Sequence, residues 1–192
     1  MIIAIDLDDI LAESLKSFID FHNKNYKTKL KTGDFKSFYL QEIIYIDRKE
    51  ELKRVRLFDD SRHFDEIPPL EGAREVVKEL SKKNKLVIVT SRPQKQEKRT
   101  REWTLKYFPE IKEIFFIRKD YHRHSKTKAE VCKEIGASFL IEDKLDYAEE
   151  CAKQGIKVLL LDYPWNRKNN LSRLITRVSS WKDIREKIET SK

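Results

Sequence analysis

The sequence contains few of the residues that interrupt regular structure and few that form covalent or metal cross-links. Its 192 residues include 4 glycines, 5 prolines and 2 cysteines. Scarce glycine and proline predict helices and strands joined by short loops. Cys132 and Cys151 form no CxxC or Cys/His pattern, which excludes a cysteine-based zinc site and a disulfide framework. We therefore expect free, partly buried thiols in a reducing compartment.

The sequence also lacks long hydrophobic runs. No apolar run approaches the length of a bilayer, and the first one leads straight into Asp6 without the features of a signal peptide. These absences predict a cytoplasmic protein with no membrane partner.

Charged residues are abundant, and the balance is basic. They make up 39% of the chain, with 41 Lys and Arg against 33 Asp and Glu, for a net charge of +8. A basic surface suits an anionic partner, either a phosphorylated metabolite or a nucleic acid. The basic residues are spread along most predicted helices, which favours solvated helix faces over a nucleic-acid-binding stripe. The sequence gives no indication of the oligomeric state.

Short apolar runs alternate with helical patterns over most of the chain. The runs predicted as strands are 1–5, 85–89, 114–117, 139–141 and 157–161. The helices predicted between and after the later strands are 71–83, 94–107, 126–135, 147–154 and 181–188. This alternation is typical of βαβ units and predicts an α/β fold with a three-layer, Rossmann-like parallel sheet.

The segment that follows the first strand does not share this alternation. Residues 14–26 repeat apolar side chains at helical spacing, and the pair Pro68-Pro69 marks a boundary. We therefore expect a core domain formed by 1–12 and 69–192, interrupted by a helical insertion at 13–68.

Aromatic residues of this insertion fit two roles, either stacking on a ligand or forming the core of the insertion itself. They are Phe18, Phe35, Phe38, Tyr39 and Tyr45. His22 is predicted to lie on the surface of the helix at 14–26.

Three carboxylates, Asp6, Asp8 and Asp9, follow the first apolar run. In parallel sheets ligands bind at the carboxyl ends of the strands. Asp6 and Asp8 share a face if the strand extends that far, because side chains two residues apart do so. Crowded carboxylates repel one another and lose hydration, and a hard cation such as Mg²⁺ relieves both costs. An aspartate-rich turn or helix cap without any ligand also fits this stretch alone.

Polar residues of compatible chemistry occur at the ends of two later strands and at the start of one helix. They are Thr90, Ser91 and Arg92 after the second strand, Lys126 and Lys128 at the helix start, and Glu142, Asp143 and Asp146 after the fourth strand. Phosphoryl transfer through an aspartyl-phosphate requires a carboxylate nucleophile, an acid for the leaving oxygen, and cationic and hydroxyl groups around the phosphoryl oxygens. The strand ends and the helix start together supply all of these groups.

This ordered set resembles the haloacid dehalogenase superfamily of phosphohydrolases along the full chain. The similar motifs are, in order, Asp6-Leu7-Asp8, then Thr90, then Lys126 or Lys128, and finally Glu142-Asp143. The resemblance implies that Asp6 is the nucleophile and Asp8 the general acid/base. Of the two lysines we favour Lys128, because it directly precedes the helix start at 129–131.

The same resemblance implies how substrate and metal are held. The phosphoryl group is expected to contact Thr90, Ser91, Arg92 and Lys128. Mg²⁺ is expected to bind Asp6, Asp143 and the backbone carbonyl of Asp8, with Glu142 and Asp146 as further candidate ligands. Arg92 has an alternative role, the capping of a surface helix. Asp9 stands where the family commonly has glycine, which changes the turn and adds a charge.

The position of the insertion and the segments 162–167 and 177–181 resemble the 5′(3′)-deoxyribonucleotidase branch of this superfamily. Members of that branch remove phosphate from nucleoside monophosphates, and their insertion covers the site as a cap. The resemblance implies a small phosphorylated substrate, with a nucleotide as the leading candidate. Other interpretations are a phosphatase of another metabolite, a nucleic-acid-binding or end-processing protein, and a binding module. The intact set of acids argues against the last.

Overall fold

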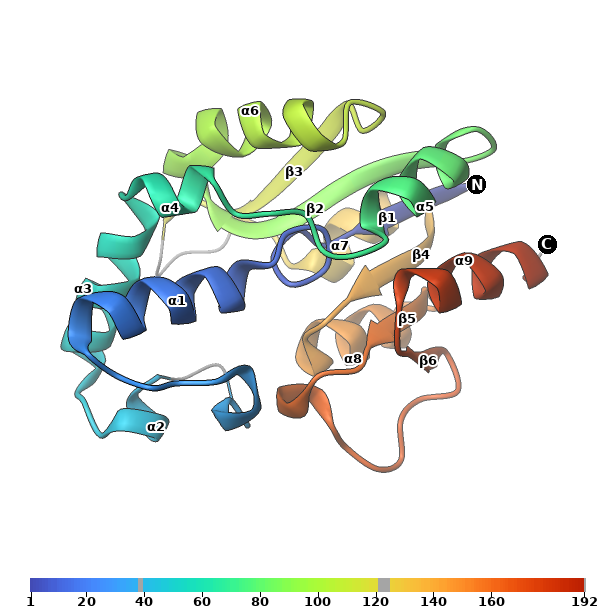
Figure 1. The fold of residues 1–192 in the computed structure, drawn as a ribbon. Coiled ribbons are helices and arrows are strands. Elements are labelled where there is room, and N and C mark those ends of the chain that lie inside the picture. Colours follow the sequence, from blue (N-terminus) through green and yellow to red (C-terminus); the bar gives the residue numbers. More distant parts are fainter. Residues whose placement is uncertain (38–39, 121–124, 192) are drawn as a thin grey trace.

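A computed structural model of the chain describes residues 1–37, 40–120 and 125–191. Its centre is a parallel six-stranded sheet with the order β3-β2-β1-β4-β5-β6 (Figure 1). The strands are β1 (Ile2–Ile5), β2 (Lys85–Pro93), β3 (Glu113–Arg118), β4 (Ala137–Glu142), β5 (Lys157–Leu161) and β6 (Ile175–Val178). The predicted α/β fold with a parallel sheet is confirmed.

The strand that the sequence did not predict is β6. It lies at the edge of the sheet beside β5, and Thr176 and Arg177 interrupt its apolar residues. An edge strand does not need a continuous apolar run, so hydrophobicity alone does not reveal it.

Helices cover both faces of the sheet and give three layers. They are α5 (Ala73–Ser81), α6 (Glu97–Tyr107) and α9 (Trp181–Thr190) on one face, with α7 (Lys128–Glu134) and α8 (Leu145–Lys153) on the other. Ile3 and Ile5 of β1 pack in the first apolar cluster, and Ala4 packs in the second. The central strand is therefore buried on both faces, which explains its uninterrupted apolar sequence.

The helical insertion lies beyond the carboxyl ends of the strands (Figure 1). Its helices are α1 (Ser14–Tyr26), α2 (Gln41–Ile44), α3 (Arg48–Asp59) and α4 (Arg62–Asp65). Short 3₁₀ helices occur at η1 (Thr32–Asp34), η2 (Gln94–Gln96) and η3 (Pro164–Asn166). The chain enters and leaves the insertion side by side, because the Glu13 N–H donates to the Pro68 carbonyl at 2.9 Å and the Leu70 N–H to the Leu11 carbonyl at 2.8 Å. These crossings lie next to the predicted boundaries.

Cys132 of α7 and Cys151 of α8 are free thiols in the same apolar cluster. Both are fully buried, more than the partial burial expected from the sequence. Among the described residues, no helix combines the length and the apolar composition that crossing a bilayer requires.

Aromatic side chains form the centre of the insertion. Phe18 and Phe35 are buried, and the ring of Phe18 meets Phe58 edge-on at a centroid distance of 5.5 Å. Packing is therefore the structural role of Phe18 and Phe35. Tyr45 is 94% exposed, and Phe38-Tyr39 lies outside the described residues.

The prediction that His22 lies on the surface is wrong, because its side chain is fully buried. Its Nε2 pairs with Arg54 Nη1 at 3.1 Å, and its Nδ1 with Thr28 Oγ1 at 2.8 Å. Since an arginine only donates, we assign the proton of the neutral ring to Nδ1. The ring also stacks on Tyr26 at 4.7 Å. Burial and the charge of Arg54 lower the pKa of His22 to about 4.

We expect His22 to make the protein less stable in mild acid. In the unfolded chain a histidine has a pKa of about 6.5. As the pH falls from there towards 4, the unfolded chain takes up the proton first, so the free energy of unfolding decreases. His22→Gln should remove this loss, which amounts to roughly 2 kcal/mol between about pH 7 and about pH 5.

Urea unfolding at the two pH values measures the difference. Lys24→Gln, an exposed substitution on the same helix, is the matched control. If the free energy of unfolding decreased equally between the two pH values in the wild type and in His22→Gln, this result would contradict the assignment of a neutral, buried ring.

Candidate active site

The carboxyl ends of β1 and β4 bring two carboxylates onto one lysine. Asp6 follows β1, Glu142 ends β4, and Lys128 opens α7. Lys128 Nζ lies 2.8 Å from Asp6 Oδ1 and 2.7 Å from Glu142 Oε2. All of these side chains are buried. Residues from distant parts of the sequence therefore form one buried ion triad.

The start of α7 determines which lysine reaches the carboxylates. Thr127 Oγ1 accepts a hydrogen bond from the Glu130 N–H at 3.1 Å, and the Glu130 carboxylate accepts one from the Thr127 N–H at 2.7 Å. This capping box begins the helix at Lys128. Lys126 lies before the cap and pairs with Glu134 at 2.6 Å, where both side chains are about half exposed. The structure brings Lys128, and not Lys126, to Asp6.

The site holds more negative charge than its lysine can neutralise. Burial disfavours the Lys128 cation, but the charges of Asp6 and Glu142 outweigh this effect and raise the pKa of Lys128. Burial and the charge of Glu142 raise the pKa of Asp6 above its usual range, although Lys128 opposes them. The same two causes raise the pKa of Asp143 well above its ordinary value.

Carboxylate oxygens of Asp6, Glu142 and Asp143 lie within 4.8 Å of one another. Glu142 is already bonded, through Oε2 to Lys128 and through Oε1 to the backbone N–H groups of Asp143 and the next residue. Asp6 Oδ1 is buried near Lys128 Nζ but accepts no well-aligned hydrogen bond. The remaining oxygens of Asp6 and Asp143 carry negative charge that Lys128 does not neutralise, and such oxygens suit a hard divalent cation. Asp146 is exposed in the first turn of α8, outside this cluster.

Asp8 has a different partner, Arg92. Arg92 Nη2 donates to Asp8 Oδ1 at 2.6 Å and its Nε donates to Oδ2 at 3.1 Å, while Ser14 Oγ donates to Oδ1 at 2.5 Å. Burial alone would raise the pKa of Asp8, but the charge and hydrogen bonds of Arg92 lower it. The expected contact of Arg92 with the phosphoryl group stays a prediction. Its alternative role, the capping of a surface helix, is not seen, because the side chain is 4% exposed on β2 and binds Asp8.

The hydroxyl residues of β2 emerge at the same edge of the sheet as Asp6. The register pairs Ile5 with Ile88, so Thr90 lies just beyond the end of β1. Thr90 is fully buried, and its Oγ1 accepts a hydrogen bond from the Arg92 N–H at 3.1 Å. The neighbouring Ser91 is only half-buried.

Asp9 shapes the turn that leads into α1. Its backbone is left-handed, with φ of 58°, a conformation that L-residues other than glycine adopt at a cost and that aspartate tolerates better than most. Its Oδ1 accepts a hydrogen bond from the Leu15 N–H at 2.9 Å, and its carbonyl accepts one from the Tyr163 hydroxyl at 3.0 Å. Burial raises the pKa of Asp9 to about 7. The side chain therefore caps a helix start and lies outside the cluster of candidate ligands.

The segment after β5 holds Asp143 in place. Trp165 Nε1 donates to Asp143 Oδ2 at 2.9 Å, and Asn166 Nδ2 donates to the carbonyls of Asp143 and Leu161, each at 2.7 Å. Arg177 Nη1 donates to Asn166 Oδ1 at 2.5 Å. We call Trp165, Asn166 and Arg177 the Asp143 brace. The sequence analysis included the segments that contain these residues in the family resemblance. It did not predict that the segments contact each other, because this contact depends on the unpredicted strand β6.

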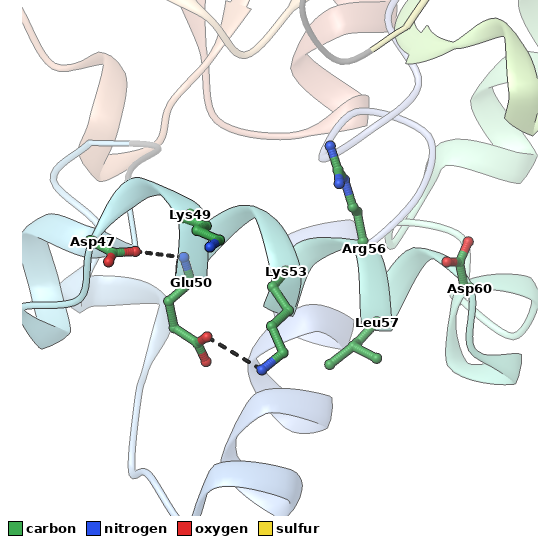
Figure 2. Close-up of a pocket in the computed structure, with 7 residues that line it drawn as sticks. All are labelled: Asp47, Lys49, Glu50, Lys53, Arg56, Leu57 and Asp60. Carbon is green, nitrogen blue, oxygen red and sulfur yellow. Dashed lines mark hydrogen bonds and ion pairs between the residues drawn. The ribbon is translucent and has the colours of Figure 1, made fainter.

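Two hollows lie against the insertion. The larger, of about 600 Å³, runs along α3 (Figure 2) and is lined by Asp47, Lys49, Glu50, Lys53, Arg56, Leu57 and Asp60. None of the candidate catalytic residues lines it. The smaller, of about 480 Å³, is lined by Leu52 and Val55 of α3, by Lys144 at the start of α8, and by Arg118 and Trp165. We call it the α3–α8 cleft, and it adjoins the site through Trp165.

Sequence comparisons match the chain over its full length. The model of the family "5' nucleotidase, deoxy (Pyrimidine), cytosolic type C protein" matches residues 1–192. A nucleotidase from Clostridium acetobutylicum is 28% identical over 186 residues, which cover 95% of this chain and 90% of that protein. A 5'(3')-deoxyribonucleotidase from Bacillus subtilis is 30% identical over 190 residues, which cover 97% of this chain and 98% of that protein.

Solved structures share the fold. A haloacid dehalogenase-like hydrolase from Streptococcus pneumoniae has a TM-score of 0.69 at 13% identity, over 97% of each chain. A haloacid dehalogenase-like protein from Agrobacterium tumefaciens has a TM-score of 0.70 at 13% identity, over 99% of this chain and 98% of that one. The solved structures show a haloacid dehalogenase-like fold, and the family match and the 30% identical relative show that the chain belongs to the cytosolic type C 5′-nucleotidase family of phosphoric monoester hydrolases.

Proposed function

We propose that this phosphohydrolase removes phosphate from deoxyribonucleoside or ribonucleoside monophosphates, with Mg²⁺ and through an aspartyl-phosphate on Asp6. The observation that carries the proposal is the placement of Asp6 between Lys128 and Asp143 at the carboxyl edge of the sheet. The printed names of the relatives, a nucleotidase and a 5'(3')-deoxyribonucleotidase, support the substrate class. The free, buried thiols agree with a cytoplasmic location.

In the first step a carboxylate oxygen of Asp6 attacks the phosphorus. The ester P–O bond breaks with its electron pair on the leaving oxygen, and Asp8 gives that oxygen a proton. Arg92 keeps Asp8 ionised in the free enzyme. When the substrate binds, the negative charge of its phosphoryl group offsets the positive charge of Arg92 and so raises the pKa of Asp8. Asp8 can then carry the proton that it delivers to the leaving oxygen.

In the second step water attacks the phosphorus of the aspartyl-phosphate while Asp8 takes a proton from it. Phosphate leaves, and the Asp6 carboxylate is regenerated. Lys128 has a further N–H besides those facing Asp6 and Glu142, and this donor and the Thr90 hydroxyl bind phosphoryl oxygens.

Asp6, Asp143 and the backbone carbonyl of Asp8 would hold Mg²⁺, in agreement with the oxygen-rich, negatively charged cluster. Bound there, the ion would neutralise charge on the phosphoryl oxygens. Glu142 remains on Lys128 and positions it. Residues 13–68 act as the cap, since their helices lie over the carboxyl edge of the sheet.

Asp6→Asn should abolish turnover while the fold persists, because an amide does not attack phosphorus and the change relieves carboxylate crowding. We expect phosphate release to fall at least about a thousandfold. The assay compares p-nitrophenyl phosphate, nucleoside monophosphates and sugar phosphates with and without Mg²⁺. Asp20→Asn, which changes an exposed acid of α1, is the matched control and should keep its activity. Near-normal rates in Asp6→Asn would exclude Asp6 as the nucleophile.

The two lysines make a second matched pair. Lys128→Met leaves Asp6 and Glu142 buried without a counter-ion and should lower the free energy of unfolding by about 3–5 kcal/mol. Lys126→Met removes one surface ion pair and should cost no more than about 1 kcal/mol. Urea unfolding and phosphatase assays test both variants. A larger loss of stability and activity in Lys126→Met would reverse the assignment.

The Asp143 brace should control metal affinity. Asn166→Ala removes the donor to the Asp143 carbonyl and leaves the Asp143 carboxylate free to turn. We expect the dissociation constant of Mg²⁺, measured by calorimetry without substrate, to rise about tenfold or more. Trp165→Phe, which deletes the indole N–H together with part of the ring, should act in the same direction.

Asn169→Ala, an exposed change in the following loop, is the control for the brace. Unchanged Mg²⁺ affinity in both brace variants would mean that Asp143 does not ligate the ion or does not need the brace.

A further inference from the structure

The α3–α8 cleft offers space next to the candidate catalytic acids. Its volume of about 480 Å³ is large enough for a nucleoside. Trp165 lines it while donating to Asp143, and Leu52 and Val55 of α3 add apolar side chains. A substrate with its phosphate at Asp6 therefore has room for its remaining part in this cleft.

Trp165 forms a rigid wall of the cleft. Its ring stacks on Tyr163 with centroids 4.3 Å apart and planes only 8° from parallel. Its indole N–H is fixed on Asp143. A rigid aromatic wall combined with apolar side chains favours a flat ring as the ligand.

Arg118, at the end of β3, is a polar group in the cleft that the fold leaves unused. Its Nε is buried without a hydrogen-bond partner, and its guanidinium forms no hydrogen bond or ion pair with the residues that the structure describes. By contrast, the guanidinium groups of Arg92, Arg99 and Arg177 each donate to oxygen atoms. A buried donor without an acceptor costs free energy, so a ligand that brings an acceptor is stabilised there.

Neither of the two carboxylates that line the cleft meets this need, and one of them, Asp146, lies exposed in the first turn of α8. Glu51 accepts hydrogen bonds from Arg48 and from the Leu40 N–H, both within the insertion. A ligand in the cleft can therefore supply the acceptor that Arg118 Nε lacks.

We propose that Arg118 contacts the nucleobase of the substrate and selects bases with a carbonyl oxygen over adenine. The inference rests on the proposed nucleotidase function. A guanidinium has several N–H donors and no acceptor. Guanine presents N7 and O6 as two adjacent acceptors, whereas adenine presents N7 beside an amino group that is itself a donor. The guanidinium of Arg118 can therefore donate to both acceptors of guanine, whereas on adenine one of its N–H groups faces another N–H donor.

The test uses two substrates that differ at one edge of the base. Deoxyinosine monophosphate carries an oxygen at C6, and deoxyadenosine monophosphate carries an amino group there. We expect kcat/KM to be at least about tenfold higher for the inosine compound. Arg118→Ala should remove most of this preference, mainly by raising KM for deoxyinosine monophosphate.

p-Nitrophenyl phosphate, which has no base, separates recognition from chemistry. Its kcat/KM should change less than about twofold in Arg118→Ala, since Arg118 does not act on the phosphoryl group. Arg118→Lys should recover part of the preference, because an ammonium group donates but lacks the planar fork. Arg74→Ala, which removes an exposed arginine of α5, is the matched control and should behave as the wild type.

Three outcomes would overturn the inference. The first is equal use of the two purine nucleotides by the wild type. The second is a loss of kcat/KM in Arg118→Ala that is as large for p-nitrophenyl phosphate as for the nucleotides. The third is a loss of kcat/KM in Arg118→Ala that occurs only with deoxyguanosine 3′,5′-bisphosphate as the substrate, which would assign Arg118 to a second phosphate. If Arg118→Ala does not fold, calorimetric binding of deoxyinosine and deoxyadenosine to the wild type and Arg118→Lys decides the question. Hydrolysis of p-nitrophenyl phosphate but of no nucleotide would instead refute the proposed substrate class.

Discussion

The pairing of Lys128 with Asp6 and Glu142 places the strictest demand on the surrounding structure. The register of β1 and β4 pairs Ile5 with Ile141, so the next residue of each strand brings two carboxylates side by side. Without a cation between them, repulsion and lost hydration would oppose both the pairing of the strands and the burial of their ends. The capping box that begins α7 at Lys128 supplies that cation. Strand register, helix start and charge balance are therefore consequences of one another.

The C-terminal part of the chain fixes the position of Asp143. This residue lies in the loop after β4, where the backbone alone does not fix a carboxylate. Asn166 joins the loop to the end of β5 by donating to the Asp143 and Leu161 carbonyls, and Arg177 of β6 holds Asn166. Edge strand β6 adds Val178 and Ile175 to the apolar clusters on the two faces of the sheet, and it provides the arginine that completes the brace. Its sequence, in which the polar pair Thr176-Arg177 lies between two apolar residues, reflects this double role.

Apolar patterning made the core strands and the position of Asp6 predictable, because a strand buried on both faces must be continuously apolar up to its end. Lys128 could be preferred over Lys126 since helix starts are local in sequence. The Asp8–Arg92 pair joins residues 84 positions apart, and nothing in the pattern of hydrophobicity records which polar side chains meet across such a separation. His22 shows the same limit, because a polar residue on an otherwise amphipathic helix is buried only when a specific partner such as Arg54 meets it.

Asp8 also connects the chemistry of the sheet edge to the position of the insertion. The Arg92 guanidinium lies 4.4 Å from the ring centre of Phe64 in α4, and Arg99 of α6 lies over the same ring at 4.7 Å. Arg99 in turn donates to backbone carbonyls and a carboxylate around the corner between α3 and α4. Both arginines belong to the core and Phe64 to the insertion, so moving α4 away would expose Arg92 to water and weaken its hold on Asp8. The low pKa of Asp8 is thus a property of the docked insertion as much as of Arg92 itself.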